Sequence, residues 1–221
     1  MNLVVRKLIA KELFVNRWFI IGGGLASIAS AVLAGFGRMA FNIGALMWMT
    51  SIVALGVMLA IYGVQNERKG QSLQFVLSLP LSPADYVRSK VIGLLLCYFL
   101  MWLVATASAI VLVVATDVAD GLLPYVILLS LFLLANFSLV LCGALHATTE
   151  AAVAASIIVT NMLVSVYMFA IATLPGLADH MFEATPVWND TVFTILGTEL
   201  AVLAAALILP FLIAARRRDF L

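Results

Sequence analysis

Six apolar runs, each about 20 residues or longer, take up most of the 221-residue sequence, and none of them contains Lys or Arg. A helix needs roughly 20 apolar residues to cross a hydrocarbon core about 30 Å thick. Alternation with a period of two is absent, and each run is about twice as long as a barrel strand. The sequence therefore predicts an all-α integral membrane protein with six transmembrane helices. The expected spans are 18–37, 43–64, 91–116, 122–145, 151–174 and 192–215.

Composition agrees with this prediction and limits the number of domains. Hydrophobic residues make up 65% of the chain and charged residues only 10%. In soluble domains roughly half of the residues are apolar and about a quarter are charged. The segments between the runs are too short for a second domain, so residues 1–221 are expected to form one membrane domain. Cys97 and Cys142 fall inside spans and are expected to be core residues rather than a disulfide.

The basic residues are distributed asymmetrically. They precede the first span, lie between spans two and three, and follow span six, whereas Arg38 is alone on the opposite side. The positive-inside rule predicts that both termini are cytoplasmic. The basic groups are Arg6, Lys7, Lys11 and Arg17, then Arg68, Lys69, Arg88 and Lys90, and finally Arg216, Arg217 and Arg218.

Residues 1–17 mix basic and apolar side chains, which predicts a helix at the cytoplasmic interface. The amphipathic pattern is imperfect because Glu12 falls on the apolar side and Phe14 on the polar side. A cleaved signal peptide is the alternative interpretation of a basic start before an apolar run. The length of the first run favours a membrane span.

The one long polar segment, residues 65–90, separates two of the most apolar runs. Its first half predicts a surface helix with a polar stripe, which ends before Pro80 because proline disfavours a helical residue before it. Ser82 as N-cap, Pro83 at the first helical position and Asp85 predict a second helix that continues into span three. The segment could transmit a push from a soluble partner or merely close a helical hairpin, and the residues alone do not favour either.

The stretch ERKGQSLQFVLSLPLSPADYVRSKVIG, Glu67 to Gly93, resembles a motif of the ABC type-2 transport permeases: acidic-x-x-G-x-[ST]-L-x-x-L-L-S-x-P-[LV]-S, followed by K-x-x-G. Six spans, cytoplasmic termini, a basic amphipathic start and the final RRRDFL also fit that family. The matching positions are Glu67, Gly70, Ser72, Leu73, Leu77, Ser78, Pro80, Leu81, Ser82, Lys90 and Gly93.

The resemblance implies that the polar segment holds a coupling helix that docks on a nucleotide-binding subunit, and that the protein resides in the cell membrane, plasma or bacterial inner. It further implies a permease dimer, of two identical or closely homologous chains, with two copies of the ATPase subunit. The expected coupling residues are Glu67, Gly70, Gln71, Leu73, Gln74, Val76, Leu77, Ser78, Leu79 and Pro80.

The same resemblance implies a dimer contact through spans one and five, and short helices dipping into the outer leaflet within residues 175–191. Small residues recur every four positions in span one, a pattern that allows close helix packing. Packing inside one chain explains that pattern equally well. The expected contact residues are Gly22, Gly23, Ala26, Ser27 and Ser30.

Motifs for chemistry are missing from the sequence. It contains no G-x-x-x-x-G-K-[ST] phosphate loop, so ATP and Mg are expected to bind the partner subunit, with no cofactor and no catalytic residue in this chain. His146 and Glu150 have a spacing that could suit a metal, but they flank a tight turn where Thr148 or Thr149 would cap the next helix. We expect no metal site, no enzyme activity and no nucleic-acid partner.

Polar residues inside the spans are candidates for a transport pathway, although polar contacts between helices explain most of them equally well. Glu199 is an ionisable group within span six and therefore a functional candidate. It could contact substrate, pair with Arg38, reach the outer headgroups or line a wet vestibule. The possible lining residues are Asn161, Ser165, Thr160, Asn136 and Glu199.

Together these features predict the permease subunit of an ATP-driven exporter. The lack of a large external domain favours amphipathic or hydrophobic cargo such as a peptide, lipid or drug. Two alternatives remain: a haem-exporter-like subunit of cytochrome c maturation, and a non-transporting membrane scaffold that recruits a soluble partner.

Overall fold

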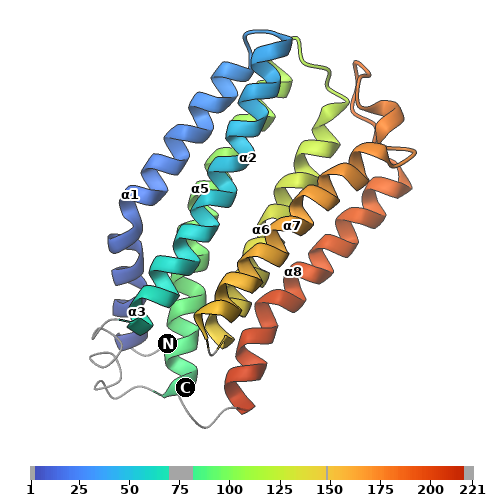
Figure 1. The fold of residues 1–221 in the computed structure, drawn as a ribbon. Coiled ribbons are helices and arrows are strands. Elements are labelled where there is room, and N and C mark those ends of the chain that lie inside the picture. The colour runs from blue at the N-terminus through green and yellow to red at the C-terminus, as the bar shows by residue number, and fades with distance from the viewer. Residues whose placement is uncertain (1–2, 70–81, 148, 217–221) are drawn as a thin grey trace.

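The computed structural model describes residues 3–69, 82–147 and 149–216, and the regular structure in these ranges is helical (Figure 1). Six helices are long and apolar enough to cross a membrane, as predicted, so the chain is a multi-pass membrane protein. They are α1 (Leu3–Ala34), α2 (Arg38–Ala60), α5 (Pro83–Ala115), α6 (Leu122–His146), α7 (Glu150–Thr173) and α8 (Asp190–Arg216).

The second span does not end with α2. A π-helical turn, η1 (Ile61–Gln65), and the short α3 (Asn66–Lys69) continue the same course. Both described ends of the chain lie at one end of the bundle together with α3 and the start of α5 (Figure 1). We call this the terminal end, and the opposite end, with the turns around residues 35–37, 116–121 and 174–189, the far end.

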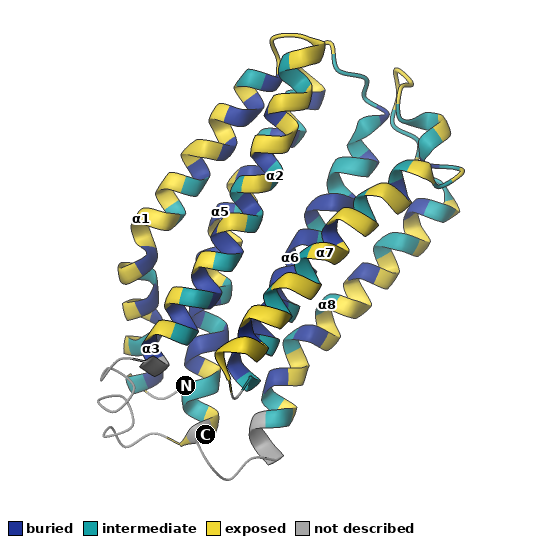
Figure 2. Ribbon diagram, in the orientation of Figure 1, coloured by how far each residue is buried: buried dark blue, intermediate teal, exposed yellow. Residues whose placement is uncertain are grey.

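The helices form two groups. In the first group α1 packs along both α2 and α5, and in the second α7 and α8 each pack on α6. Contacts of α6 with α5 and α2 join the groups, so α6 is central and mostly buried (Figure 2). The outward faces of α1, α7 and α8 are apolar yet exposed, as expected for surfaces that meet lipid.

Buried polar side chains in the first group donate to backbone carbonyls of neighbouring helices. The indole nitrogen of Trp48 donates to the Ala105 carbonyl oxygen at 2.8 Å, and the Tyr98 hydroxyl donates to that of Leu133 at 3.1 Å. Tyr98 also stacks on Phe137, with ring centroids 4.0 Å apart. These contacts tie α2 to α5 and α5 to α6, and they satisfy groups that would be costly to bury alone.

Helices α1 and α2 approach closely at Gly44. A Cβ atom at this position would lie 2.5 Å from the Ser30 carbonyl oxygen and 2.7 Å from the Ala34 Cβ. Near the same crossing, the hydroxyls of Ser27 and Ser51 lie 2.9 Å apart. The small residues of the first span therefore serve at least in part to pack α1 within this chain.

Two helix starts follow the sequence prediction. The Ser82 side chain accepts a hydrogen bond from the Asp85 backbone nitrogen at 3.1 Å, and Thr149 accepts one from that of Ala152 at 3.2 Å. These caps satisfy backbone donors that the first turn of a helix leaves unpaired. Because of the first cap, α5 begins at Pro83 and runs without a break through the whole third span.

Three expectations are not confirmed by the described residues. A separate interfacial helix over residues 1–17 is not confirmed, because α1 is a single helix from Leu3 into the span. Within 175–189 the regular structure is one 3-10 turn, η2 (Ala178–His180), in place of several short helices. The coupling helix expected at residues 71–79 lies outside the described residues, as do the coupling residues Gly70 to Pro80.

Candidate functional site

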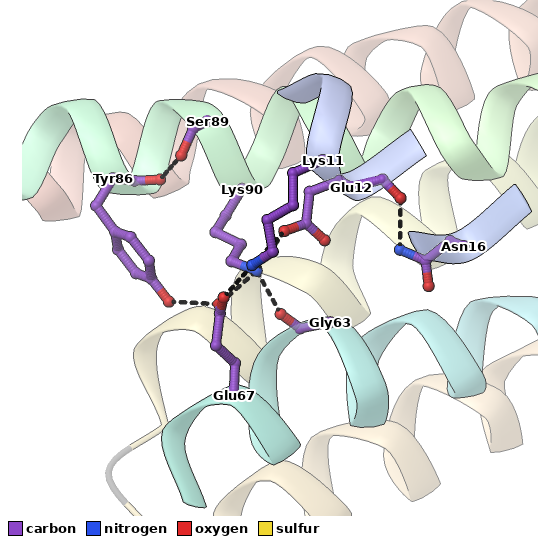
Figure 3. A network of polar contacts seen from close by, with 8 residues as sticks. All are labelled: Lys11, Glu12, Asn16, Gly63, Glu67, Tyr86, Ser89 and Lys90. Atoms are coloured by element: carbon purple, nitrogen blue, oxygen red, sulfur yellow. Dashed lines mark hydrogen bonds and ion pairs between the residues drawn. The ribbon is translucent and has the colours of Figure 1, made fainter. Parts of the chain in front are cut away.

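Four charged side chains from three helices meet at the terminal end. Lys11 and Glu12 come from α1, Glu67 from α3 and Lys90 from α5 (Figure 3). We call these four residues the charge cluster. The side chains of Glu12, Glu67 and Lys90 are each only 6% exposed, whereas that of Lys11 is 42% exposed.

Lys90 is the centre of the charge cluster. Its Nζ donates to Glu12 Oε1 at 2.7 Å and to the Gly63 carbonyl oxygen at 2.9 Å, and it forms an ion pair with Glu67. Gly63 belongs to the π-helical turn η1, whose wider hydrogen-bond pattern is commonly associated with functional positions. A single ammonium thus joins α5 to α1, to η1 and to α3.

Glu67 also accepts hydrogen bonds from Lys11 and from Tyr86, a neighbour outside the cluster. Its Oε1 accepts from Lys11 Nζ at 2.7 Å, and its Oε2 accepts from the Tyr86 hydroxyl at 3.3 Å. Burial by itself would raise the pKa of the Glu67 carboxyl, but the positive charges and hydrogen bonds of Lys90 and Lys11 outweigh burial and lower that pKa below 4.5. Glu67 is therefore ionised at neutral pH and completes two opposite pairs of charges.

Two glycines allow the helices to pack closely around the cluster. A Cβ atom on Gly93 would lie 2.9 Å from Glu12 Cγ, and one on Gly63 would lie 2.6 Å from Leu94 Cδ2. Lys90 and Gly93 are three residues apart and therefore share one face of α5. The K-x-x-G spacing in this chain thus supplies both the cation for Glu12 and the space for its side chain.

A pocket of about 330 Å³ lies beside the charge cluster, between the start of α1 and the run from η1 to α3. Its lining includes Lys11, Glu12 and Lys90, and the rings of Phe19 and Tyr62, whose centroids are 5.7 Å apart. The cluster is therefore buried within the helices but bordered by space into which its groups could move.

Sequence reasoning identified Glu67 and matched Lys90 and Gly93 to a motif, but it did not predict that they meet Glu12. The available signal was the misplacement of Glu12 on the apolar side of an amphipathic helix. The structure explains that position: Val5, Ile9, Glu12 and Asn16 are the buried face of the first part of α1. Glu12 is on that face because Lys90 is there to neutralise it.

The expected dimer-contact residues of α1 divide into two sets. Ser27 and Ser30 are buried within this chain, and Gly23 faces Met101 of α5. Gly22 and Ala26 are exposed, and Gly22 has open space where a Cβ would be. A contact with a second chain through α1 is therefore available to Gly22 and Ala26 without rearrangement of the helices.

The expected pathway residues do not come together as one polar lining. Thr160 and Asn161 are half-buried and donate to carbonyl oxygens of α7 itself, and Ser165 is exposed. Asn136 is buried in α6, where its Oδ1 has no hydrogen-bond partner among the described residues. Only Glu199 forms a side-chain contact with another helix that a transport role could use.

Glu199 of α8 is 5% exposed and accepts a hydrogen bond from the Tyr167 hydroxyl of α7. Arg38 is exposed at the first residue of α2, and no ion pair between it and Glu199 is present among the described residues, so the possible pairing with Arg38 is not confirmed. A carboxylate reaching the outer headgroups is inconsistent with this burial. Glu199 therefore belongs to the interior of the second group of helices.

No family model matches this chain, and a search of curated proteins gives no match. Among the described residues no group of three or more His, Cys, Asp or Glu side chains could hold a metal ion. The charge cluster and Glu199 are thus the features from which a function must be argued.

Proposed function

We propose that this chain is the transmembrane permease subunit of an ATP-driven exporter of the ABC type-2 kind, acting as a dimer and coupled to a separate ATPase subunit. The observation that carries the proposal is the charge cluster. Glu67 is three residues before the segment 70–81, Lys90 is nine residues after it and about two turns into α5, and both bind the first part of α1. The two helices that flank the proposed coupling segment are thereby fastened to a third helix.

Such an arrangement is suited to passing a displacement into the membrane domain. A push on the segment would act through α3 and η1 on α2, through Lys90 on α5, and through Lys11 and Glu12 on α1. Helix α5 is a single helix of 33 residues, about 50 Å long, which reaches the far end. Because the helices are rigid and interlocked by buried charges, they would move together.

The finer parts of the proposal follow the resemblance of Glu67–Gly93 to the family motif. Both termini would be cytoplasmic, the first part of α1 would lie at the cytoplasmic interface, and residues 71–79 would form the coupling helix. Two chains would meet through spans one and five, with Gly22 and Ala26 in the contact. ATP and Mg would bind the partner, and the cargo would be amphipathic or hydrophobic.

Copurification tests this proposal. The tagged chain, extracted from its native membrane in mild detergent, is expected to bring down a Walker-motif ATPase whose vanadate-sensitive activity depends on residues 71–79. Gln74→Pro and Leu77→Pro should lower that activity or release the ATPase, because proline breaks a helix. Absence of any ATPase from the purified chain would contradict the proposal.

A matched control and a second readout separate transport from recruitment. Asp117→Asn changes an exposed carboxylate at the far end and should leave the complex unaffected. Vesicles with the intact complex should accumulate an amphipathic dye when ATP is supplied. A complex that hydrolyses ATP but moves no member of a broad dye and lipid panel would favour the membrane scaffold instead.

A further inference from the structure

Helices α7 and α8 lie beside each other along a line of sparse packing, which we call the α7–α8 seam. Each packs on α6, and they make few contacts with each other. The hydrogen bond from the Tyr167 hydroxyl to Glu199 Oε1 crosses this seam. The seam is therefore a place where the bundle can admit another group without breaking extensive helix packing.

The buried carboxylate of Glu199 has few groups that stabilise its charge. It is nine residues after Asp190, the first residue of α8, which places it about 14 Å along the helix from the far end. Its side chain is buried, and Oε2 has no hydrogen-bond partner in the part of the chain that the structure describes. One neutral phenol is a weak replacement for the hydration that a carboxylate loses on burial.

The Tyr167 ring borders the carboxylate, and a second ring stacks on it. The ring of Tyr167 stacks on that of Phe132 from α6, with centroids 3.8 Å apart and planes 2° from parallel. Aromatic faces carry negative quadrupole charge and attract cations, and they also provide apolar surface for a ligand's organic body. A buried carboxylate beside stacked rings is complementary to a lipophilic cation, and opposed to an anion of the same shape.

We infer that Glu199, with the Tyr167 and Phe132 rings, forms a binding site for the positively charged group of a lipophilic organic cation at the α7–α8 seam. The carboxylate supplies the opposite charge through its unpartnered oxygen, and the rings hold the apolar body. Only the identification of such a cation as cargo rests on the proposed exporter function. The binding site itself is a property of this chain.

Equilibrium binding of two ions of the same shape and opposite charge tests the site. Radiolabelled tetraphenylphosphonium and tetraphenylborate are dialysed against the purified full chain in lipid nanodiscs, with empty nanodiscs subtracted. The wild type should bind the phosphonium saturably, and Glu199→Gln should weaken that binding at least tenfold. Glu183→Gln, the same change at an exposed position of the far end, should bind like the wild type.

Substitutions of Tyr167 separate the ring from the hydroxyl and keep the test decisive if Glu199→Gln does not fold. Tyr167→Phe keeps the ring and frees Glu199 Oε1, so phosphonium affinity should be unchanged or higher. Tyr167→Leu removes the ring and should weaken binding severalfold. Equal affinity in wild type and Glu199→Gln, or equal losses for phosphonium and borate, would overturn the inference, as would equal binding by Tyr167→Phe and Tyr167→Leu.

The failures of the two proposals are distinguishable. Charge-selective binding that depends on Glu199, in a chain that brings down no ATPase, would leave the cation site standing and remove the exporter. A complex with coupled ATPase activity whose phosphonium binding ignores Glu199→Gln would leave the exporter standing and remove the cation site.

Discussion

The two groups of helices differ in how completely their buried charged side chains are paired. In the first group, the charge cluster buries two carboxylates and a lysine, yet every charge has an opposite partner within about 3 Å. In the second group, Glu199 is buried with a tyrosine hydroxyl as its hydrogen-bond donor and one oxygen unpaired. The first arrangement is complete without a ligand, and the second is not.

This difference suggests separate roles. A fully paired buried network is costly to break and fixes the helices relative to one another. An incompletely paired carboxylate stabilises the fold little and gains most when a counter-ion arrives. The terminal end is thus suited to transmit movement, and the α7–α8 seam is suited to recognise a ligand.

The largest predicted loss of stability is that of Lys90→Met, which tests whether the paired charges of the cluster stabilise the fold. It removes the buried ammonium that pairs with both Glu12 and Glu67, and should lower the free energy of unfolding by about 3 to 5 kcal/mol. Equilibrium unfolding in mixed detergent micelles measures this loss. Arg88→Met, at an exposed position two residues earlier, should change stability little, and equal effects of the two would refute the structural role of the cluster.

Glu67→Gln should lower stability by about 2 kcal/mol at neutral pH, because two ammonium groups lose a charged acceptor. The folded-state pKa of Glu67 is below 4.5, so its ionised form stabilises the fold above pH 4.5 and this contribution disappears as the pH falls through the folded pKa. The stability difference between wild type and Glu67→Gln should shrink on acidification. A constant difference across that pH range would contradict the assigned ion pairs.

Gly44→Ala tests whether the first group is also packed backbone to backbone. The added Cβ would lie 2.5 Å from the Ser30 carbonyl oxygen, so α1 and α2 must separate. Overpacking costs about 1 to 3 kcal/mol, and the better helix propensity of alanine offsets up to about 1 kcal/mol, leaving a net loss of roughly 1 kcal/mol. Gly197→Ala on α8, with open space around its Cβ, should be neutral or stabilising in the same unfolding assay.

The smallest predicted change in stability is that of Glu199→Gln, which tests whether Glu199 differs from the structural charges of the cluster. Glu199→Gln replaces a poorly paired carboxylate with a neutral group of the same shape, and the amide oxygen can still accept from Tyr167. Because the buried carboxylate is poorly compensated, the unfolding free energy without ligand should stay unchanged or rise by no more than about 1 kcal/mol. A loss as large as that of Lys90→Met would show that Glu199 is a structural charge like those of the cluster.

The sequence was sufficient to predict the number of spans, the cap at Ser82 and a cap at Thr148 or Thr149, because these depend on local composition and short-range hydrogen bonds. The charge cluster was not predictable in the same way. Lys90 and Glu12 are 78 residues apart, and only the packing of α5 on α1 brings them together. The misplaced Glu12 showed that a partner was needed, but nothing local identified Lys90 as that partner.

The contact at the α7–α8 seam was not predictable for the same reason. A glutamate within an apolar run was recognisable as a functional candidate, but its partner was not, because Tyr167 reaches it only when α7 and α8 pack on α6. A pairing with Arg38 was one of several possibilities that the sequence left open. Helix rotation, which places Glu199 inside the bundle and Arg38 outside it, decided the outcome.

The most direct test of the central claim is whether the charge cluster couples the ATPase to the membrane helices. Cysteine substituted for the exposed Thr116, at the far end of α5, is labelled with a thiol reagent in the purified complex, without nucleotide and after trapping with ATP and vanadate; the native Cys97 and Cys142 are buried. The labelling rate should change severalfold on trapping in the wild type. In Glu67→Gln, with the ATPase still bound, that change should disappear; an undiminished change would contradict the account.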